Sequence, residues 1–126
     1  MVGLVVVSHS ERAAEGIVEI AAEMAGDTAI EAVGGDGKGG IGTVPDAIGD
    51  AIDAAADGDG VVVLVDLGSA VMNADVAVEL SDVEAVIADA PVLEGAVNAA
   101  VAATDPSATL DSVREQAEAA RDIEKL

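Results

Sequence analysis

A run of valines that leads to the only histidine of the chain is the feature that most constrains the fold. Val5, Val6 and Val7 follow Gly3 and precede a Ser-His-Ser turn and a helical pattern. A short apolar run of this kind is typical of a parallel strand that is buried on both faces. Such a strand delivers His9 to its carboxyl end, where open α/β sheets place their functional groups.

Strands and helical patterns alternate along the 126 residues, which favours a single α/β domain over residues 1–126. We expect a three-layer, mainly parallel open sheet with flavodoxin-like strand order 2-1-3-4 and helices on both faces. The pattern predicts strands at about 5–7, 29–33, 61–65 and 84–88, and helices at about 11–25, 43–55, 69–80, 92–103 and 110–120.

Three hydroxyl residues stand where predicted helices begin. Ser10 precedes the first helical pattern, and Ser69 precedes the third. Thr43 precedes the second, with Pro45 in the first turn and Asp46 three residues on. Because a side-chain oxygen can accept a hydrogen bond from a first-turn amide, we expect all three to be N-caps.

The charge balance is strongly acidic, with 25 acidic and five basic residues and a formal net charge of -20. This balance argues against nucleic acid and anionic membrane as partners. The acidic residues are spread over helix faces and lysine is almost absent, which is typical of a halophilic protein in a salt-rich cytoplasm. No stretch is long and apolar enough to span a membrane, and no signal peptide precedes the first strand, so we expect a cytoplasmic protein.

The chain has no cysteine and no aromatic residue. The first absence excludes disulfides, thiol nucleophiles and zinc-thiolate sites. With a single histidine and no spaced acidic loop of the calcium type, we expect no metal site and no cofactor. The second absence leaves a thin aliphatic core, so we expect additional burial in a homodimer.

His9 and Asp66 both follow predicted strands that are neighbours in the 2-1-3-4 order. An aspartate bonded to one imidazole nitrogen fixes the tautomer and leaves the other nitrogen free for nucleophilic attack. The same aspartate could instead cap the following turn, and the sequence alone favours neither role. A lone histidine can also be purely structural, but its place at a strand end favours chemistry.

The glycine-rich segment 34–42 contains G-x-G-x-x-G at Gly35, Gly37 and Gly40. It follows the second strand and lacks an acidic residue placed for a ribose, so a dinucleotide site is not expected. Lys38 is followed by Gly39, which excludes a Walker loop. The segment could cradle a phosphoryl oxygen with its amides, or it could be a mobile surface loop.

Two further elements could assist a phosphoryl group on the histidine. Gly68 and Ser69 offer amides and a hydroxyl at a helix N-terminus, where anions are favoured. Arg12 stands in the first turn after the histidine and could assist as well, although pairing with Glu11 or Glu15 is slightly favoured.

Five segments, in order and at similar spacing, together resemble the DhaM family. These proteins are phosphocarrier subunits of phosphoenolpyruvate-dependent dihydroxyacetone kinases, and their fold is that of mannose-type IIA proteins of the phosphotransferase system. The segments are Val5–Ser10, Ala14–Gly16, Gly40–Thr43, Asp66–Ala70 with Met72–Ala74, and Ala90–Ala96.

The resemblance implies that His9 accepts a phosphoryl group from phospho-HPr and passes it to ADP held on the DhaL subunit, in glycerol metabolism. It implies that Asp66 orients the imidazole, and that the phosphoryl pocket is lined by Gly42, Thr43, Gly68 and Ser69. It also implies a homodimer. Some family members carry HPr-like and enzyme I-like domains behind this one; because this chain stops after the last helix, we expect its donor to be a separate protein.

Two other functions are compatible with these residues. The nearer is a IIA component of a mannose-family sugar transporter, which shares the chemistry but has a IIB acceptor. The Asp-Leu-Gly-Ser-Ala loop at 66–70 favours the kinase, because the transport branch carries a bulkier Gly-Gly-Ser/Thr-Pro version. The second, from another class, is a non-catalytic regulatory or ligand-binding module, in which His9 would be replaceable.

Overall fold

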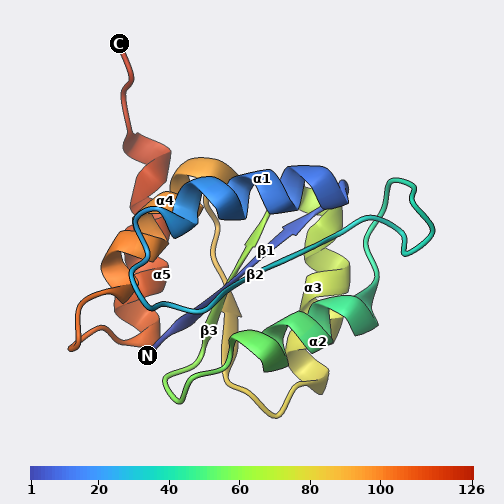
Figure 1. Cartoon of the computed structure of the whole chain (residues 1–126), viewed down its shortest axis with the longest axis horizontal. Helices are drawn as coiled ribbons and strands as arrows, with labels where there is room; N and C mark the ends of the chain where they lie inside the picture. Colours follow the sequence, from blue (N-terminus) through green and yellow to red (C-terminus); the bar gives the residue numbers. More distant parts are fainter.

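The computed structural model describes residues 1–126 as alternating strands and helices (Figure 1). The elements are β1 (Gly3–Ser8), α1 (Glu11–Ala22), β2 (Ile30–Gly34), α2 (Pro45–Ala55), β3 (Val61–Val65), α3 (Gly68–Leu80), β4 (Ala85–Ile87), α4 (Val92–Ala103), α5 (Leu110–Glu118) and a 3-10 turn (Ala119–Asp122). No helix combines the length and hydropathy that crossing a bilayer requires.

The four strands form one sheet in the order β2-β1-β3-β4. Every neighbouring pair is parallel, with Val6 of β1 opposite Ala32 of β2 and Leu64 of β3. The predicted α/β class and strand order are therefore confirmed. Because all strands run the same way, their carboxyl ends meet at one edge of the sheet, which carries the segments after β1 and β3.

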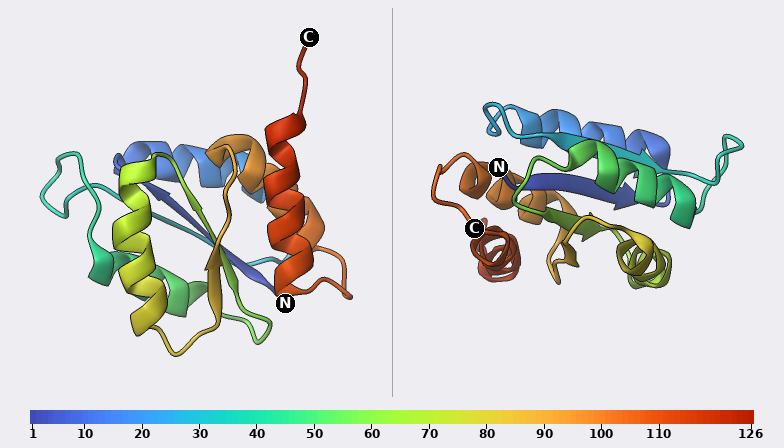
Figure 2. Two further views of the ribbon diagram at one scale, coloured as in Figure 1. Left: turned by 180° about the vertical axis from the view of Figure 1, so that it is seen from behind. Right: turned by 90° about the horizontal axis from the view of Figure 1, so that it is seen from below.

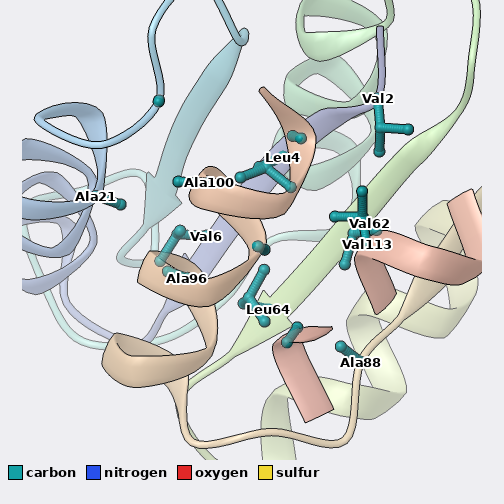
Figure 3. Close-up of a cluster of buried hydrophobic side chains, with 14 residues drawn as sticks. Val2, Leu4, Val6, Ala21, Val62, Leu64, Ala88, Ala96, Ala100 and Val113 are labelled. Atoms are coloured by element: carbon teal, nitrogen blue, oxygen red, sulfur yellow. The ribbon is translucent and has the colours of Figure 1, made fainter. Parts of the chain in front are cut away.

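Alternate side chains of the central strands build two separate cores. Leu4, Val6 and Leu64 face α1, α4 and α5, as the buried cluster in Figure 3 shows. Val5 and Val63 face α2 and α3 on the other side of the sheet. Figure 2 shows the sheet between these two groups of helices. The continuous valine run follows from this arrangement, because both faces of β1 are buried.

Some predicted boundaries are too long. Helix α1 ends at Ala22 rather than Ala25, because Met24 and Ala25 make tight i→i−3 bonds before Gly26 turns at a φ of 56°. Strand β4 has three residues instead of the five expected at 84–88. The last helix is α-helical only to Glu118 and continues as the 3-10 turn.

The N-cap predictions were correct for one of three helices. The Ser10 hydroxyl accepts a hydrogen bond from the Ala13 amide at 3.2 Å. Thr43 and Ser69 were wrong: α2 begins after Val44 and α3 after Leu67, and neither helix has a side-chain cap. Both hydroxyls instead form hydrogen bonds with other side chains around the histidine, described below.

Candidate active site

The site lies where β1 and β3 end side by side. Backbone pairing continues past the strands, since the Asp66 amide donates to the Val7 carbonyl at 3.1 Å. His9 follows β1 directly and Asp66 follows β3 directly. The parallel register therefore brings these two residues, 57 positions apart in the sequence, to the same point of the sheet edge.

Asp66 makes three hydrogen bonds to the turn that carries the histidine. Its Oδ1 lies 2.9 Å from Nδ1 of His9, and its Oδ2 accepts from the His9 amide at 3.0 Å and from the Ser8 hydroxyl at 2.9 Å. The Ser8 hydroxyl in turn accepts from the Ser10 amide at 3.1 Å. Both oxygens of Asp66 are thus engaged by this turn, and the alternative role as a cap of α3 is not observed.

These contacts fix the protonation pattern of the pair. Partial burial opposes ionisation of Asp66, but the hydrogen bonds from the His9 amide, the His9 ring and the Ser8 hydroxyl outweigh it and hold the pKa of this carboxyl below its usual range. An ionised Asp66 can only accept, so Nδ1 of His9 carries the ring proton. In the neutral imidazole the lone pair is then on Nε2.

Ser69 stands against that lone pair. Its hydroxyl oxygen lies 2.9 Å from Nε2 of His9 and, with Nε2 unprotonated, the hydroxyl donates. Ser69 and Gly68 are the first two residues of α3, and first-turn amides have no partner within their own helix. A group attached to Nε2 would therefore meet a hydroxyl donor and a helix N-terminus, which favour negative charge.

The segment that follows the glycine-rich loop contacts both the turn that carries His9 and helix α3. The Gly42 amide donates to the His9 carbonyl at 2.9 Å. The Asn73 amide nitrogen donates to the Thr43 hydroxyl oxygen at 2.7 Å and lies 3.3 Å from the Thr43 carbonyl oxygen. All four residues predicted to line the pocket (Gly42, Thr43, Gly68 and Ser69) therefore lie on segments that contact His9 or are tied to one that does.

Asn73 was not predicted as a site residue. Its spacing from Ser69 could have indicated it, because a residue four positions after Ser69 lies on the same face of α3. The amide of Asn73 holds Thr43 against α3, which ties the segment bonded to the His9 carbonyl to the helix that carries Ser69.

Backbone amides of the glycine-rich loop form hydrogen bonds with the side chain of Asp36, which belongs to the same loop. The Asp36 carboxylate accepts from the Lys38 amide at 2.8 Å and from the Gly40 amide at 2.9 Å. The Gly40 amide above all, and then the Lys38 amide, lower the pKa of Asp36. Two of the amides expected to cradle a phosphoryl oxygen are therefore already occupied. Positive φ angles between 80° and 83° explain the glycines at 35, 37 and 39.

Arg12 is exposed and makes no ion pair. The predicted pairing with Glu11 or Glu15 is therefore wrong. The structure instead places Arg12 beside the glycine-rich loop, at a hollow that also reaches Ser10.

Comparisons with known proteins place the chain in a family. The family described as the PTS system fructose IIA component matches residues 3–114. The Listeria innocua phosphoryl donor subunit DhaM of dihydroxyacetone kinase 2 is 42% identical over 106 residues, which cover 80% of this chain and 85% of the relative. The Lactococcus lactis phosphotransferase subunit DhaM is 38% identical, covering 92% and 93%.

Longer relatives and a solved structure also match. The DhaM subunit of Klebsiella michiganensis is 38% identical over 93% of this chain, which spans 26% of that protein. The crystal structure of EF1359, a protein of unknown function, superposes with a TM-score of 0.79 at 30% identity and covers 93% of this chain and 92% of that one. The chain therefore belongs to the IIA family of the phosphotransferase system, among the DhaM phosphoryl donor subunits of dihydroxyacetone kinases.

Proposed function

We propose that His9 carries a phosphoryl group as a covalent intermediate in the phosphoenolpyruvate-dependent phosphorylation of dihydroxyacetone. The observation that supports this most is the placement of the ring, with Nδ1 2.9 Å from Asp66 and Nε2 2.9 Å from the Ser69 hydroxyl. This arrangement orients Nε2 as the attacking atom beside the Ser69 hydroxyl and the first-turn amides of α3. In this role Asp66 orients the ring and also stabilises the positive charge that develops on the imidazole when Nε2 is phosphorylated.

In the charging step, Nε2 of His9 attacks the phosphorus of the donor's phosphohistidine in line. The new Nε2–P bond forms as the donor N–P bond breaks, and the electron pair returns to the donor imidazole. The ring of His9 then holds its Nδ1 proton and a positive charge, which the Asp66 carboxylate faces at 2.9 Å. Before attack the Ser69 hydroxyl rotates from Nε2, and it then donates to a phosphoryl oxygen.

The partners that suit this role are an HPr-like phosphocarrier as donor and ADP on a DhaL subunit as acceptor. The similar proteins are named as a phosphoryl donor subunit and a phosphotransferase subunit of dihydroxyacetone kinases. In the discharge step an oxygen of the terminal phosphate of ADP attacks the phosphorus, the Nε2–P bond breaks, and ATP forms on the acceptor.

The experiment that tests this function starts with the chain charged by phosphoenolpyruvate, enzyme I and HPr. The phosphorylated chain is mixed with DhaL and ADP, and ATP and the intact mass of the chain are followed together. We expect ATP to appear as the phosphoryl adduct disappears. An adduct that persists with DhaL and ADP but discharges to a sugar-transport IIB protein would contradict the kinase role and support the transport role.

We also infer a homodimer that buries part of the outer face of α3. This helix exposes an apolar stripe, with Met72 at 73% and Leu80 at 78% exposure and Val76 between them. Because the core has no aromatic residue, burial of this stripe against a second copy would add apolar contact area that the single chain lacks. Light scattering after gel filtration should give twice the mass of 12.3 kDa. A monomer at high micromolar concentration would contradict this inference.

We also propose a cytoplasmic location in a salt-rich cell and a role in glycerol metabolism. The net charge of -20 destabilises the folded chain by self-repulsion, which counterions screen. We therefore expect the melting temperature to rise steeply with KCl between about 0.1 and 2 M. A melting temperature that is independent of salt would contradict adaptation to salt.

A further inference from the structure

The basic residues of this acidic chain are divided between two kinds of environment. Three of the five make ion pairs at the α4–α5 side of the molecule: Arg114 with Asp111 and Glu118, Arg121 with Asp89, and Lys125 with Glu94. Arg12 and Lys38 make no ion pair, although the whole chain has 25 acidic residues. Both unpaired cations belong to segments that follow β1 and β2 at the carboxyl edge of the sheet, the edge that carries His9.

Arg12 lines a hollow between the first turn of α1 and the glycine-rich loop. The volume of this α1–loop hollow is about 380 Å³, and its walls are Ser10, Glu11, Arg12, Gly35, Gly37, Gly39, Gly40 and Ile41. Its position is fixed relative to the active site, because the loop is tied to His9 through the bond from the Gly42 amide. In Figure 1 the loop projects from the end of the sheet at which α1 begins.

The α1–loop hollow offers hydrogen-bond donors without partners. The loop amides of Gly37 and Gly39 donate to no acceptor in the chain. The amides of Glu11 and Arg12 are first-turn amides of α1, and such amides have no partner within their helix. A concavity with free amides, a helix N-terminus and an arginine favours an oxyanion.

Two carboxylates are close enough to oppose an anion there. Asp36 is bonded to the Lys38 and Gly40 amides of its own loop, so its charge is already compensated in part. Glu11 lines the α1–loop hollow and forms no ion pair with Arg12. Arg12 is the only cationic residue that lines the hollow.

We propose that the α1–loop hollow binds phosphate oxygens of the acceptor nucleoside diphosphate, with Arg12 supplied in trans to a nucleotide held on the partner protein. The inference rests on the proposed function. A nucleoside diphosphate brings about three negative charges toward a chain that already carries a phosphohistidine and a net charge of -20. The donor, which brings only the phosphoryl group that is transferred, needs this compensation less.

Arg12 acts in the discharge step, where an oxygen of the terminal phosphate attacks the phosphorus and the Nε2–P bond of His9 breaks. The guanidinium neutralises the non-reacting oxygens of the nucleotide as they approach, and it can do so bidentately. Arginines supplied in trans to transferring phosphates are worth about 10³ to 10⁵ in rate. Because Arg12 is exposed, we expect a smaller effect here, about 10- to 100-fold.

The test is a single-turnover measurement of each half-reaction. Wild type, Arg12→Ala and Lys125→Ala are charged with phospho-HPr, and the charging rate is measured by intact mass. Each phosphorylated chain is then mixed with DhaL and a range of ADP concentrations. Lys125→Ala removes the same charge from the exposed tail, and melting temperatures verify that both variants fold.

We expect Arg12→Ala to charge within about twofold of wild type and to discharge to ADP about 10- to 100-fold more slowly. Lys125→Ala should match wild type in both steps, and Arg12→Lys should recover part of the discharge rate, because Lys keeps the charge and loses the bidentate geometry. Equal discharge rates for Arg12→Ala and Lys125→Ala would overturn the inference while leaving phosphorylation of His9 intact. So would an equal slowing of both half-reactions, which would indicate a general docking role. A wild-type chain that cannot be charged at all would refute the proposed function itself.

Discussion

Nδ1 of His9 lies 2.9 Å from Oδ1 of Asp66, and this contact joins the ends of the two central strands. The other carboxylate oxygen accepts the backbone amide of His9, so one side chain fixes both the position and the tautomer of the ring. The arrangement has a direct consequence for substitution, because an amide in place of the carboxylate cannot accept at both positions.

Asp66→Asn is expected to slow phosphorylation of His9 by on the order of 100-fold or more. The asparagine oxygen continues to accept the hydrogen bond from the His9 backbone amide, so the NH₂ group faces Nδ1. Nδ1 must then accept, and the ring proton moves to Nε2, the attacking atom. The rate of charging by phospho-HPr measures the effect. Asp75→Asn, an exposed position on α3, is the matched control. A rate for Asp66→Asn equal to that of the control would refute the assigned tautomer.

The same carboxylate makes stability depend on pH. The pKa of Asp66 is lower in the folded chain than its usual value, so the folded state gains from ionised Asp66 above that value. The gain is lost as the pH falls through the lowered pKa. We therefore expect the difference in unfolding free energy between wild type and Asp66→Asn to be largest near pH 6 and to shrink below about pH 4. Urea unfolding from pH 6 to pH 3 checks the direction, and a difference that grows on acidification would contradict it.

The bond from Asn73 to Thr43 predicts an energetic coupling between α3 and the segment before α2. Its nitrogen–oxygen distance of 2.7 Å between two half-buried side chains suggests about 0.5 to 1.5 kcal/mol. Unfolding free energies of Asn73→Ala, Thr43→Ala and the double variant give the coupling from one cycle. Strict additivity of the two single changes would show that the bond does not hold these segments together.

Gly3 is expected to tolerate no side chain. A Cβ at this position would lie 1.9 Å from the carbonyl oxygen of Ala55, at the point where the end of α2 packs on β1. Gly3→Ala should therefore destabilise the chain by about 3 kcal/mol or more, because backbone must move in a fully buried place. Gly16→Ala is the control: it lies in the exposed part of α1 with open space around it, and it should stabilise by about 0.5 to 1 kcal/mol. Similar effects of the two substitutions would contradict the packing at Gly3.

The strand order and the placement of His9 and Asp66 at one edge of the sheet could be predicted from the strand patterns, whereas the contact between the two side chains was one of two open alternatives for Asp66. A buried valine run identifies a central parallel strand, and parallel strands bring the residues that follow them to one edge. The residue types at those two positions, an imidazole and a carboxylate, then limit what the edge can do.

The hydroxyls of Thr43 and Ser69 show where this reasoning fails. Both stand where capping rules place an N-cap, and both instead bond to side chains 30 and 60 positions away. Local rules compare a residue only with its neighbours, so a tertiary partner that offers a better acceptor or donor is invisible to them. The same limit applies to Arg12, whose neighbouring acids suggested an ion pair that the fold does not make.

The measurement that tests the central claim most directly is intact mass spectrometry at alkaline pH after incubation with phosphoenolpyruvate, enzyme I and HPr, on wild type and on His9→Ala in parallel. The account predicts one acid-labile phosphoryl adduct on wild type and none on His9→Ala, with the phosphorus on Nε2 when the adduct is examined by NMR. An adduct that survives in His9→Ala, or no adduct on either chain with any donor, would contradict the assignment of His9 as the phosphoryl carrier.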